Sequence, residues 1–329
     1  MEVMRSVPPM SSDAALLLFG RAASLPSSAP AIATEDTSAM AVGGATGAVA
    51  VGGQVVVLHS DVEQWAHIDT GATIPQAGGG VFVTGSATRN PRTLSIGAGF
   101  GAVAAGASIS INSSSGDTKA EIGNVAVGTD APLGGTVRGI TVAATNDARP
   151  TATSFSVQAG GGGALSGSVA VVTYSGTTRA ASGASGPLGI DGYTVAATGR
   201  HGDLEDGTRE NGVDARTFNV AVGGGITLGV TVAIARNERN TEAAITGGTT
   251  STTGAVNVTA DAENTAFAHA PQITIGSASL SFMLRISHSR CARPIMESPR
   301  LMGSLVSNTS RRLLRAAIQT CCRTSADSL

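Results

Sequence analysis

The chain has 329 residues, of which 44 are glycine, while aromatic residues make up only 3% and charged residues 13%. A glycine share about twice the usual one and a charged share about half the usual one exclude a conventional core built around large rings. The formal net charge of −2 offers no basic surface for nucleic acid, so we expect no nucleic-acid partner.

Residues 1–36 come before any repeated pattern, and we expect them to be irregular or disordered. They contain a short apolar run from Ala14 to Gly20. Asp13 precedes this run and Arg21 interrupts it, which makes it a poor secretory signal. An export signal is therefore not evident in the sequence.

Four segments share one pattern, in which a short alternating apolar run, a glycine cluster, one further glycine and a second alternating run follow one another. They are AMAVGGATGAVAVGGQVVVL (39–58), TLSIGAGFGAVAAGASISI (93–111), TSFSVQAGGGGALSGSVAVV (153–172) and TFNVAVGGGITLGVTVAI (217–234). We align them on Gly53, Gly106, Gly167 and Gly229, which recur at a nearly constant interval. Self-similarity at such a period indicates a repeat protein.

Two further markers recur between these segments. Alternating runs place Val83, Val142, Val195 and Val258 at nearly the same period as the glycines. A weaker polar element recurs as TKAEIG (118–123) and TEAAITG (241–247). A fifth repeat starts at residue 265 and breaks off near residue 282.

The alternation has a period of two, which indicates strands rather than helices. Residues 217–235 are uncharged and long enough for a membrane helix, but their sister segments are diluted with Ser, Thr and Gly and favour strands. Each repeat is too thin to bury its apolar side alone, so we expect Val and Ile of successive repeats to share one continuous core. The glycines are expected to supply tight corners and close backbone approach.

These patterns predict an all-β fold, a parallel β-helix (β-solenoid) of about four repeats, each about 53–63 residues long. The predicted repeats span residues 37–282. A basic, non-repeat tail spans residues 283–329.

The blocks GGGGALSGSVAV and VGGGITLGVTVAI, together with GAVNVTADAENT, resemble repeats of large secreted bacterial exoproteins of the filamentous haemagglutinin and leukotoxin-type filamentous adhesin group. The resemblance covers residues 37–282 and concerns a repeat style, not a catalytic signature. It implies a right-handed parallel β-helix in an elongated, secreted or surface-displayed shaft that acts in adhesion. A host surface or glycan would be its ligand, and membrane association would arise only through a larger secretion context. A carbohydrate-active β-helix enzyme and a truncated fragment without independent function are the alternatives.

The tail differs from the repeats in composition. It contains eight arginines against Glu297 and Asp327, all three cysteines and a single glycine, which gives it a charge of +6 and leaves −8 for residues 1–282. One interpretation is translation in another reading frame after Phe282. The other is a short basic helix over residues 310–323, with an apolar face that touches a membrane or a partner.

Residues that carry chemistry are sparse before the tail. Lys119 is the single lysine of the chain, so we expect no phosphate-binding loop, no lysine-based catalysis and no cofactor, and we predict no catalytic residue. Arg92, Arg149 and Arg216 recur at the start of three repeats and suggest a surface ladder of arginines.

Two places remain as candidate sites. The densest acidic segment contains Asp203, Glu205, Asp206 and Glu210, which makes it a weak Ca²⁺ candidate, because hard cations favour clustered carboxylate oxygens. A solvated insertion between repeats is the other interpretation. His59 and His67 flank Trp65, a grouping that suits a metal or a sugar, or the surface of an edge strand.

Overall fold

The computed structural model describes residues 12–15, 27–75, 77, 79–129, 137–190, 192–200, 212–247, 250–252 and 254–289. Within them the protein is all-β without a helix, as predicted. Every strand pairing in these parts of the chain is parallel. No helix with the length and apolar character needed to cross a membrane is found among these residues.

Long strands recur along the chain with several short strands between them. In chain order they are β1 (Ser12–Ala15), β2 (Ser27–Glu35), β3 (Ser38–Asp61), β4 (Gln64–Ile68), β5 (Thr73–Ile74), β6 (Val81–Arg89), β7 (Arg92–Ser115), β8 (Thr118–Ile122), β9 (Ala126–Val127), β10 (Ile140–Ala148), β11 (Thr151–Ser182), β12 (Gly186–Ile190), β13 (Tyr193–Arg200), β14 (Val213–Gly223), β15 (Ile226–Ile245), β16 (Thr250–Thr252), β17 (Val256–Ala262), β18 (Ala266–His269), β19 (Gln272–Ile275) and β20 (Ala278–Ser289).

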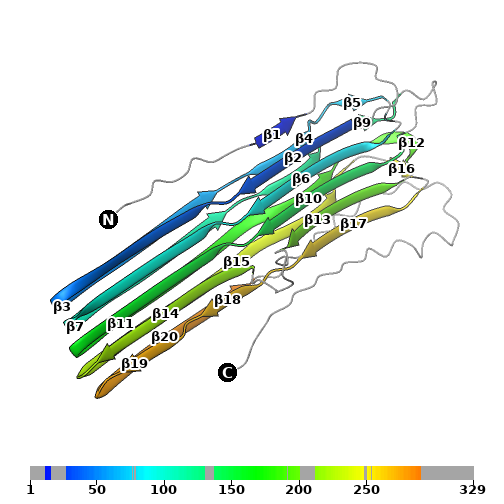
Figure 1. Cartoon of the computed structure of the whole chain (residues 1–329). Coiled ribbons are helices and arrows are strands. Elements are labelled where there is room, and N and C mark those ends of the chain that lie inside the picture. The colour runs from blue at the N-terminus through cyan, green and yellow to red at the C-terminus, as the bar shows by residue number, and fades with distance from the viewer. Residues whose placement is uncertain are drawn as a thin grey trace, which may run out of the picture.

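Successive passes of the chain lie side by side (Figure 1). In the largest sheet, β3 pairs with β7 and β7 pairs with β11. Strand β11 then pairs with both β14 and β15. Strand β14 pairs in turn with β19, and β15 pairs with β20. A second sheet has the order β17-β13-β10-β6-β2. Ser38 pairs with Arg92 and Thr151 with Asp214, so each partner lies one sequence repeat further along the chain. The repeat period read from the sequence is therefore the period of strand pairing.

The valine marker gives the pairing register correctly. Val83 pairs with Val142, Val142 with Val195, and Val195 with Val258. The polar element is also in register, because Thr118 and Thr241 both pair with Thr178.

The glycine alignment is wrong by one residue at two of its four positions. Ala107 pairs with both Gly53 and Gly167, and Gly167 pairs with Val230. Gly106 and Gly229 each precede the true register partner by one position. Since side chains alternate between the two faces of a strand, this shift moves every side chain of the block to the opposite face.

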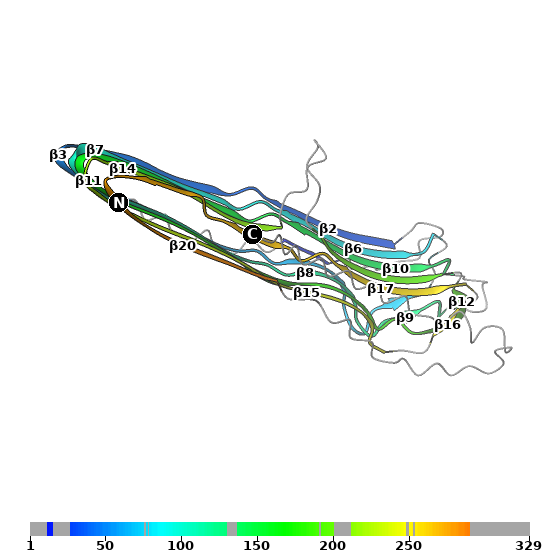
Figure 2. The same cartoon turned by 90° about the horizontal axis from the view of Figure 1, so that it is seen from below.

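The long strands double back, so that two layers of strand meet at one end of the molecule (Figure 2). We call this part the arch. Outgoing segments run toward its turns, and returning segments run away from them. The outgoing segments are 38–46, 92–100, 151–159, 214–222 and 272–275, and the returning segments are 49–61, 103–115, 163–175, 226–238 and 278–289.

Glycines form the turns of the arch, as expected for tight corners. Gly47 has φ +146°, a backbone conformation that residues with a side chain rarely adopt. A Cβ added at Gly160 would lie 2.0 Å from the carbonyl oxygen of Gly163. The bend is so tight that glycine is required at this position.

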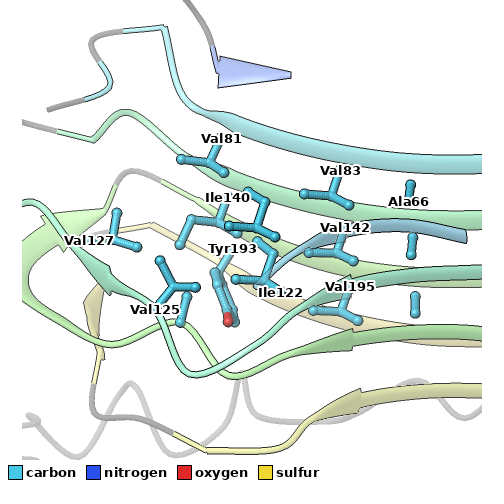
Figure 3. Close-up of a cluster of buried hydrophobic side chains, with 14 of the residues drawn as sticks. Ala66, Val81, Val83, Ile122, Val125, Val127, Ile140, Val142, Tyr193 and Val195 are labelled. Carbon is cyan, nitrogen blue, oxygen red and sulfur yellow. The ribbon is translucent and has the colours of Figure 1, made fainter. Parts of the chain in front are cut away.

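The part of the molecule away from the turns has the predicted apolar core (Figure 3). Val81, Val83, Ile140, Val142 and Val195 are buried there in three neighbouring strands. They face a layer that contains the buried side chains of Ala66, Ile122, Val125 and Val127. Each fully buried Val or Ile contributes about 1.5–3 kcal/mol. The expectation of a shared apolar interior is confirmed in this half.

The segment boundaries can be compared with the described strands. Strand β2 (Ser27–Glu35) pairs with β6 and lies inside the segment expected to be irregular. Strand β20 runs to Ser289 and pairs with β15 over its length, so pairing continues across the expected boundary after Phe282. The predicted basic helix over residues 310–323 lies outside the described residues.

Candidate functional site

The inner side of the arch carries many buried polar side chains beside its buried apolar clusters. Buried Ser156 and Ser166 approach from the two layers, with 2.9 Å between their Oγ atoms. Ser168 Oγ donates to Ser154 Oγ over 3.0 Å. Buried hydroxyls are tolerated when they are hydrogen-bonded, so these serines join the layers rather than weaken them.

Amide side chains extend this inner network. Asn112 Nδ2 donates to the carbonyl oxygen of Pro91 over 2.7 Å and to that of Thr151 over 3.0 Å. Gln158 is also buried, and a Cβ at Gly99 would lie 2.0 Å from its Oε1. Glycine at position 99 thus makes room for a long polar side chain.

The predicted apolar core is present in only part of the arch, where Val172 and Tyr174 belong to one buried cluster and Val56 and Leu58 to another. In the run TLSIGAGF, Thr93 and Ser95 are buried, whereas Leu94 and Ile96 lie on the outer side and are only partly buried. The physical reason is that hydrogen-bonded hydroxyls hold the layers close near the turns, as the 2.9 Å between Ser156 Oγ and Ser166 Oγ shows, and this spacing suits small side chains better than Val or Ile. Apolar side chains therefore occupy the outside.

The arch consequently has two apolar outer surfaces. The outgoing face is the outer side of the outgoing segments, where Phe155 and Phe218 stack with 5.1 Å between ring centroids. The returning face is the outer side of the returning segments. Exposed large apolar residues on the outgoing face are Met40, Val42, Phe100, Val222, Ile273 and Ile275. Those on the returning face are Val49, Val51, Val55, Val57, Val103, Leu165, Ile226, Leu280, Phe282, Leu284 and Ile286.

Strand register arranges the returning face in rows that cross the sheet. One row is Val51, Ala105, Leu165, Leu228 and Leu280, in which every side chain but Ala105 is large, and another is Val55, Ile109, Val169, Val232 and Leu284. The row between them is Gly53, Ala107, Gly167, Val230 and Phe282. Its first three members are small, so a shallow groove lies between the two rows across β3, β7 and β11, and Val230 and Phe282 close it on β15 and β20. In the described residues, no charged side chain interrupts these rows.

Two arginines are buried where the arch meets the apolar core. Arg89 is 1% exposed, and its Nη1 donates to Thr118 Oγ1 over 3.0 Å and to Asn146 Oδ1 over 2.8 Å. The guanidinium carbon of Arg239 lies 5.1 Å from the centre of the Tyr174 ring. Burial lowers the pKa of Arg239 below its ordinary value.

Sequence reasoning missed this pair, although one signal was present. Arg89 stands six residues after Val83, an even number, so the alternation that buries Val83 also points Arg89 inward. The hydrogen bonds of Arg89 to Thr118 and Asn146 connect strands of neighbouring repeats and hold the layers together. These contacts are structural.

The predicted ladder of arginines is wrong. Register pairs Arg92 with Thr151 and Arg216 with Thr153, so the arginines do not lie opposite one another. Arg149 lies 3.6 Å from the carboxylate of Asp147. Their recurrence reflects similar sequence at each strand start rather than a shared surface.

Asp203, Glu205, Asp206 and Glu210, the weak Ca²⁺ candidate, lie outside the described residues. Among the residues that the structure describes, no group of three or more His, Cys, Asp or Glu is placed to hold a metal.

The aromatic candidate is a local stack in β4. Trp65 and His67 lie with ring centroids 4.1 Å apart, and His67 Nε2 is 3.3 Å from the carboxylate of Asp69. One face of the Trp65 ring is therefore already covered by His67. His59 lies on the exposed side of β3.

Lys119 is held by two carboxylates. Its Nζ lies 2.7 Å from Glu63 Oε1 and 2.9 Å from Asp117 Oδ2. Burial acts to lower the pKa of Lys119, but the hydrogen bonds to Glu63 and Asp117 outweigh it, so the pKa is raised. A lysine held in its charged form is a poor nucleophile.

Comparison of the chain with protein-family models, curated proteins and solved structures finds no match. The described geometry offers extended contact surfaces, chiefly the two outer faces of the arch.

Proposed function

We propose that this chain forms a segment of a β-solenoid shaft, a structural and adhesive part of a secreted or surface-displayed bacterial exoprotein. It acts by display and contact and not by catalysis. The observation that carries the proposal is the register of the strands. Each pass pairs in parallel with the pass before it, as when Ser38 pairs with Arg92 and Arg92 with Thr151.

Stacked passes suit a shaft because each pass contacts only its neighbours, and length can be added pass by pass. The large outer surfaces of the stack are made of regular strands rather than of loops around a pocket. The likeness of the glycine-cluster blocks to filamentous haemagglutinin-type repeats supports the adhesive role and a right-handed winding.

A binding assay with the full chain tests this function. The chain would be applied to a glycan array and to fixed animal cells, with a heat-denatured sample as the control. We expect binding to cells or to a glycan class by the folded chain alone, with no release of reducing ends from that glycan. Release of reducing ends would instead identify a carbohydrate-active enzyme, and absence of binding to every surface would contradict the adhesive role.

A further inference from the structure

We propose that the returning face of one chain packs against the returning face of a second copy, as the two sheets of a β-sandwich do. The proposal does not depend on the adhesive role. It rests on the area of this face, on its rows of large and small side chains, and on the absence of charge from the rows nearest the turns; Asp61, Arg236 and Glu238 lie on the same side but further from the turns.

The area approaches what a specific interface needs. The eleven large apolar side chains named above for this face are between 40% and 74% exposed. A half-exposed Val or Leu leaves roughly 50 Å² of apolar surface in water, so the eleven leave roughly 550 Å². That approaches the about 800 Å² per partner of a standard interface and reaches the upper range for the largest patch on a monomer. Partly exposed neighbours such as Ile109 and Val169 add to it.

The shallow groove has no explanation within one chain. A Cβ at Gly53 would lie 3.9 Å from its nearest neighbour, and one at Gly167 would lie 3.4 Å away, both ordinary contacts. By contrast, a Cβ at the inward Gly106 would lie 2.3 Å from Gln158 Nε2. Glycine in a strand interior is less stable than alanine, so the small row is unfavourable unless another surface enters it. A ridge of the facing sheet fits this groove, because two sheets pack about 10 Å apart with interdigitating side chains.

The lack of charge favours a second copy. In a two-fold symmetric interface the same patch meets itself, so a charge on the axis would meet its own copy, and a charge off the axis would need an opposite charge elsewhere on the same patch. An uncharged patch has neither requirement. The nearest charged position is Arg236, at the border of the patch beside Thr173.

A lipid surface fits less well. In the described residues β3 pairs only with β7, and β20 pairs only with β15, which leaves backbone groups unpaired at both sides of the arch. Unpaired backbone groups are costly in hydrocarbon. When two returning faces pack together, these edges stay in water.

Sedimentation equilibrium of the full chain, in reducing buffer so that the three cysteines do not cross-link, tests the proposal. We expect a mass of about twice 32.4 kDa. Val51→Lys places a charge on the returning face, at a position 71% exposed. We expect it to weaken association by about 100-fold or more, because the lysine would be buried in the interface without a partner.

Val42→Lys is the matched control, since Val42 is 62% exposed on the outgoing face. It should leave association unchanged, while Gly53→Leu, which fills the groove, should weaken it. Far-ultraviolet circular dichroism would verify that each variant folds. The proposal fails if the unmodified chain sediments as a monomer at 100 µM, or if Val42→Lys and Val51→Lys have equal effects. It also fails if the monomeric chain floats with phosphatidylcholine vesicles in place of dimerising, which would identify lipid as the occupant.

Discussion

Individual glycines in the arch differ in what their missing side chain allows, even within one run of four. Gly160 stands where a Cβ would lie 2.0 Å from the carbonyl oxygen of Gly163, whereas a Cβ at Gly161 would meet nothing within 4 Å. The first glycine is required by the turn, and the second is not. This contrast within the run QAGGGGAL could not be read from the sequence, because it depends on which strand position enters the bend.

Alanine substitutions separate the two roles. Gly160→Ala should lower the free energy of unfolding by about 1–3 kcal/mol, the usual cost of forcing extra atoms into a packed site. Gly161→Ala should be neutral or raise it by up to about 1 kcal/mol, because alanine restricts the unfolded chain more than glycine does. Urea denaturation of both variants checks this. Equal loss of stability in the two would show that the turn is not built as described.

A buried tyrosine makes stability depend on pH. Burial raises the pKa of Tyr193 above its ordinary value, and the hydrogen bond to Ser182 only partly opposes this. The unfolded chain therefore loses the phenolic proton first as pH rises. The stabilising contribution is complete below the unfolded pKa of about 10 and is lost as pH rises through the folded pKa.

We expect the urea midpoint to fall between pH 9 and pH 11.5, and to fall less in Tyr193→Phe. Lys119, whose pKa is also raised, should still lose its contribution over the same range in both proteins. Identical pH profiles for the two proteins would show that Tyr193 does not titrate differently on folding.

At the level of the strand, the sequence predicts alternation but not which side faces inward. The ambiguity is visible in the run Leu94, Ser95 and Ile96. Leu94 and Ile96 put apolar side chains on one face of the strand, and Ser95 puts a small polar side chain on the other. The rule that the apolar side of a strand is buried predicts that Leu94 and Ile96 point inward. The same rule is correct for Val81 and Val83 in the apolar core. In the arch the narrow gap and the hydrogen bonds between hydroxyls reverse the choice. Tertiary packing decided this, and a single strand does not reveal it.

Thiol labelling distinguishes the two orientations. In a background where Cys291, Cys321 and Cys322 are replaced by serine, Ile96→Cys should react readily with a maleimide. Ser95→Cys, at a position that is 0% exposed, should react at least about tenfold more slowly, because reaction requires local opening. The reverse order would restore the apolar interior that the sequence favoured.

For the molecule as a whole, the period and parallel stacking were predictable, because Val83, Val142, Val195 and Val258 repeat at the pairing offsets. The alignment on the glycine blocks gave a register that is wrong by one residue, because the glycine clusters differ in length at the turns. The shift in strand pairing between Gly160 and Gly163 shows this. The candidate contact surface was not predictable, because it follows from the reversed faces of the arch.

The resulting shape is long in the strand direction. Strand β10 and the outgoing part of β11 span residues 140–159, and twenty residues at about 3.3 Å each extend roughly 65 Å. Small-angle X-ray scattering, extrapolated to low concentration, should give a radius of gyration clearly above the about 20 Å expected for a compact chain of this length. A radius no larger than that of a compact chain would contradict the arch.

The parallel ladders also set how the molecule resists force. A pull along the strands loads all hydrogen bonds of a ladder in shear at once, so neighbouring passes yield together or not at all. A pull across the strands, along the stacking direction, opens one ladder after another from the end, since each pass is bonded only to its neighbours. A tether attached at Val49 and Ile140 would therefore withstand more tension than one that peels β3 from β7, and single-molecule stretching in the two geometries should give two different rupture forces.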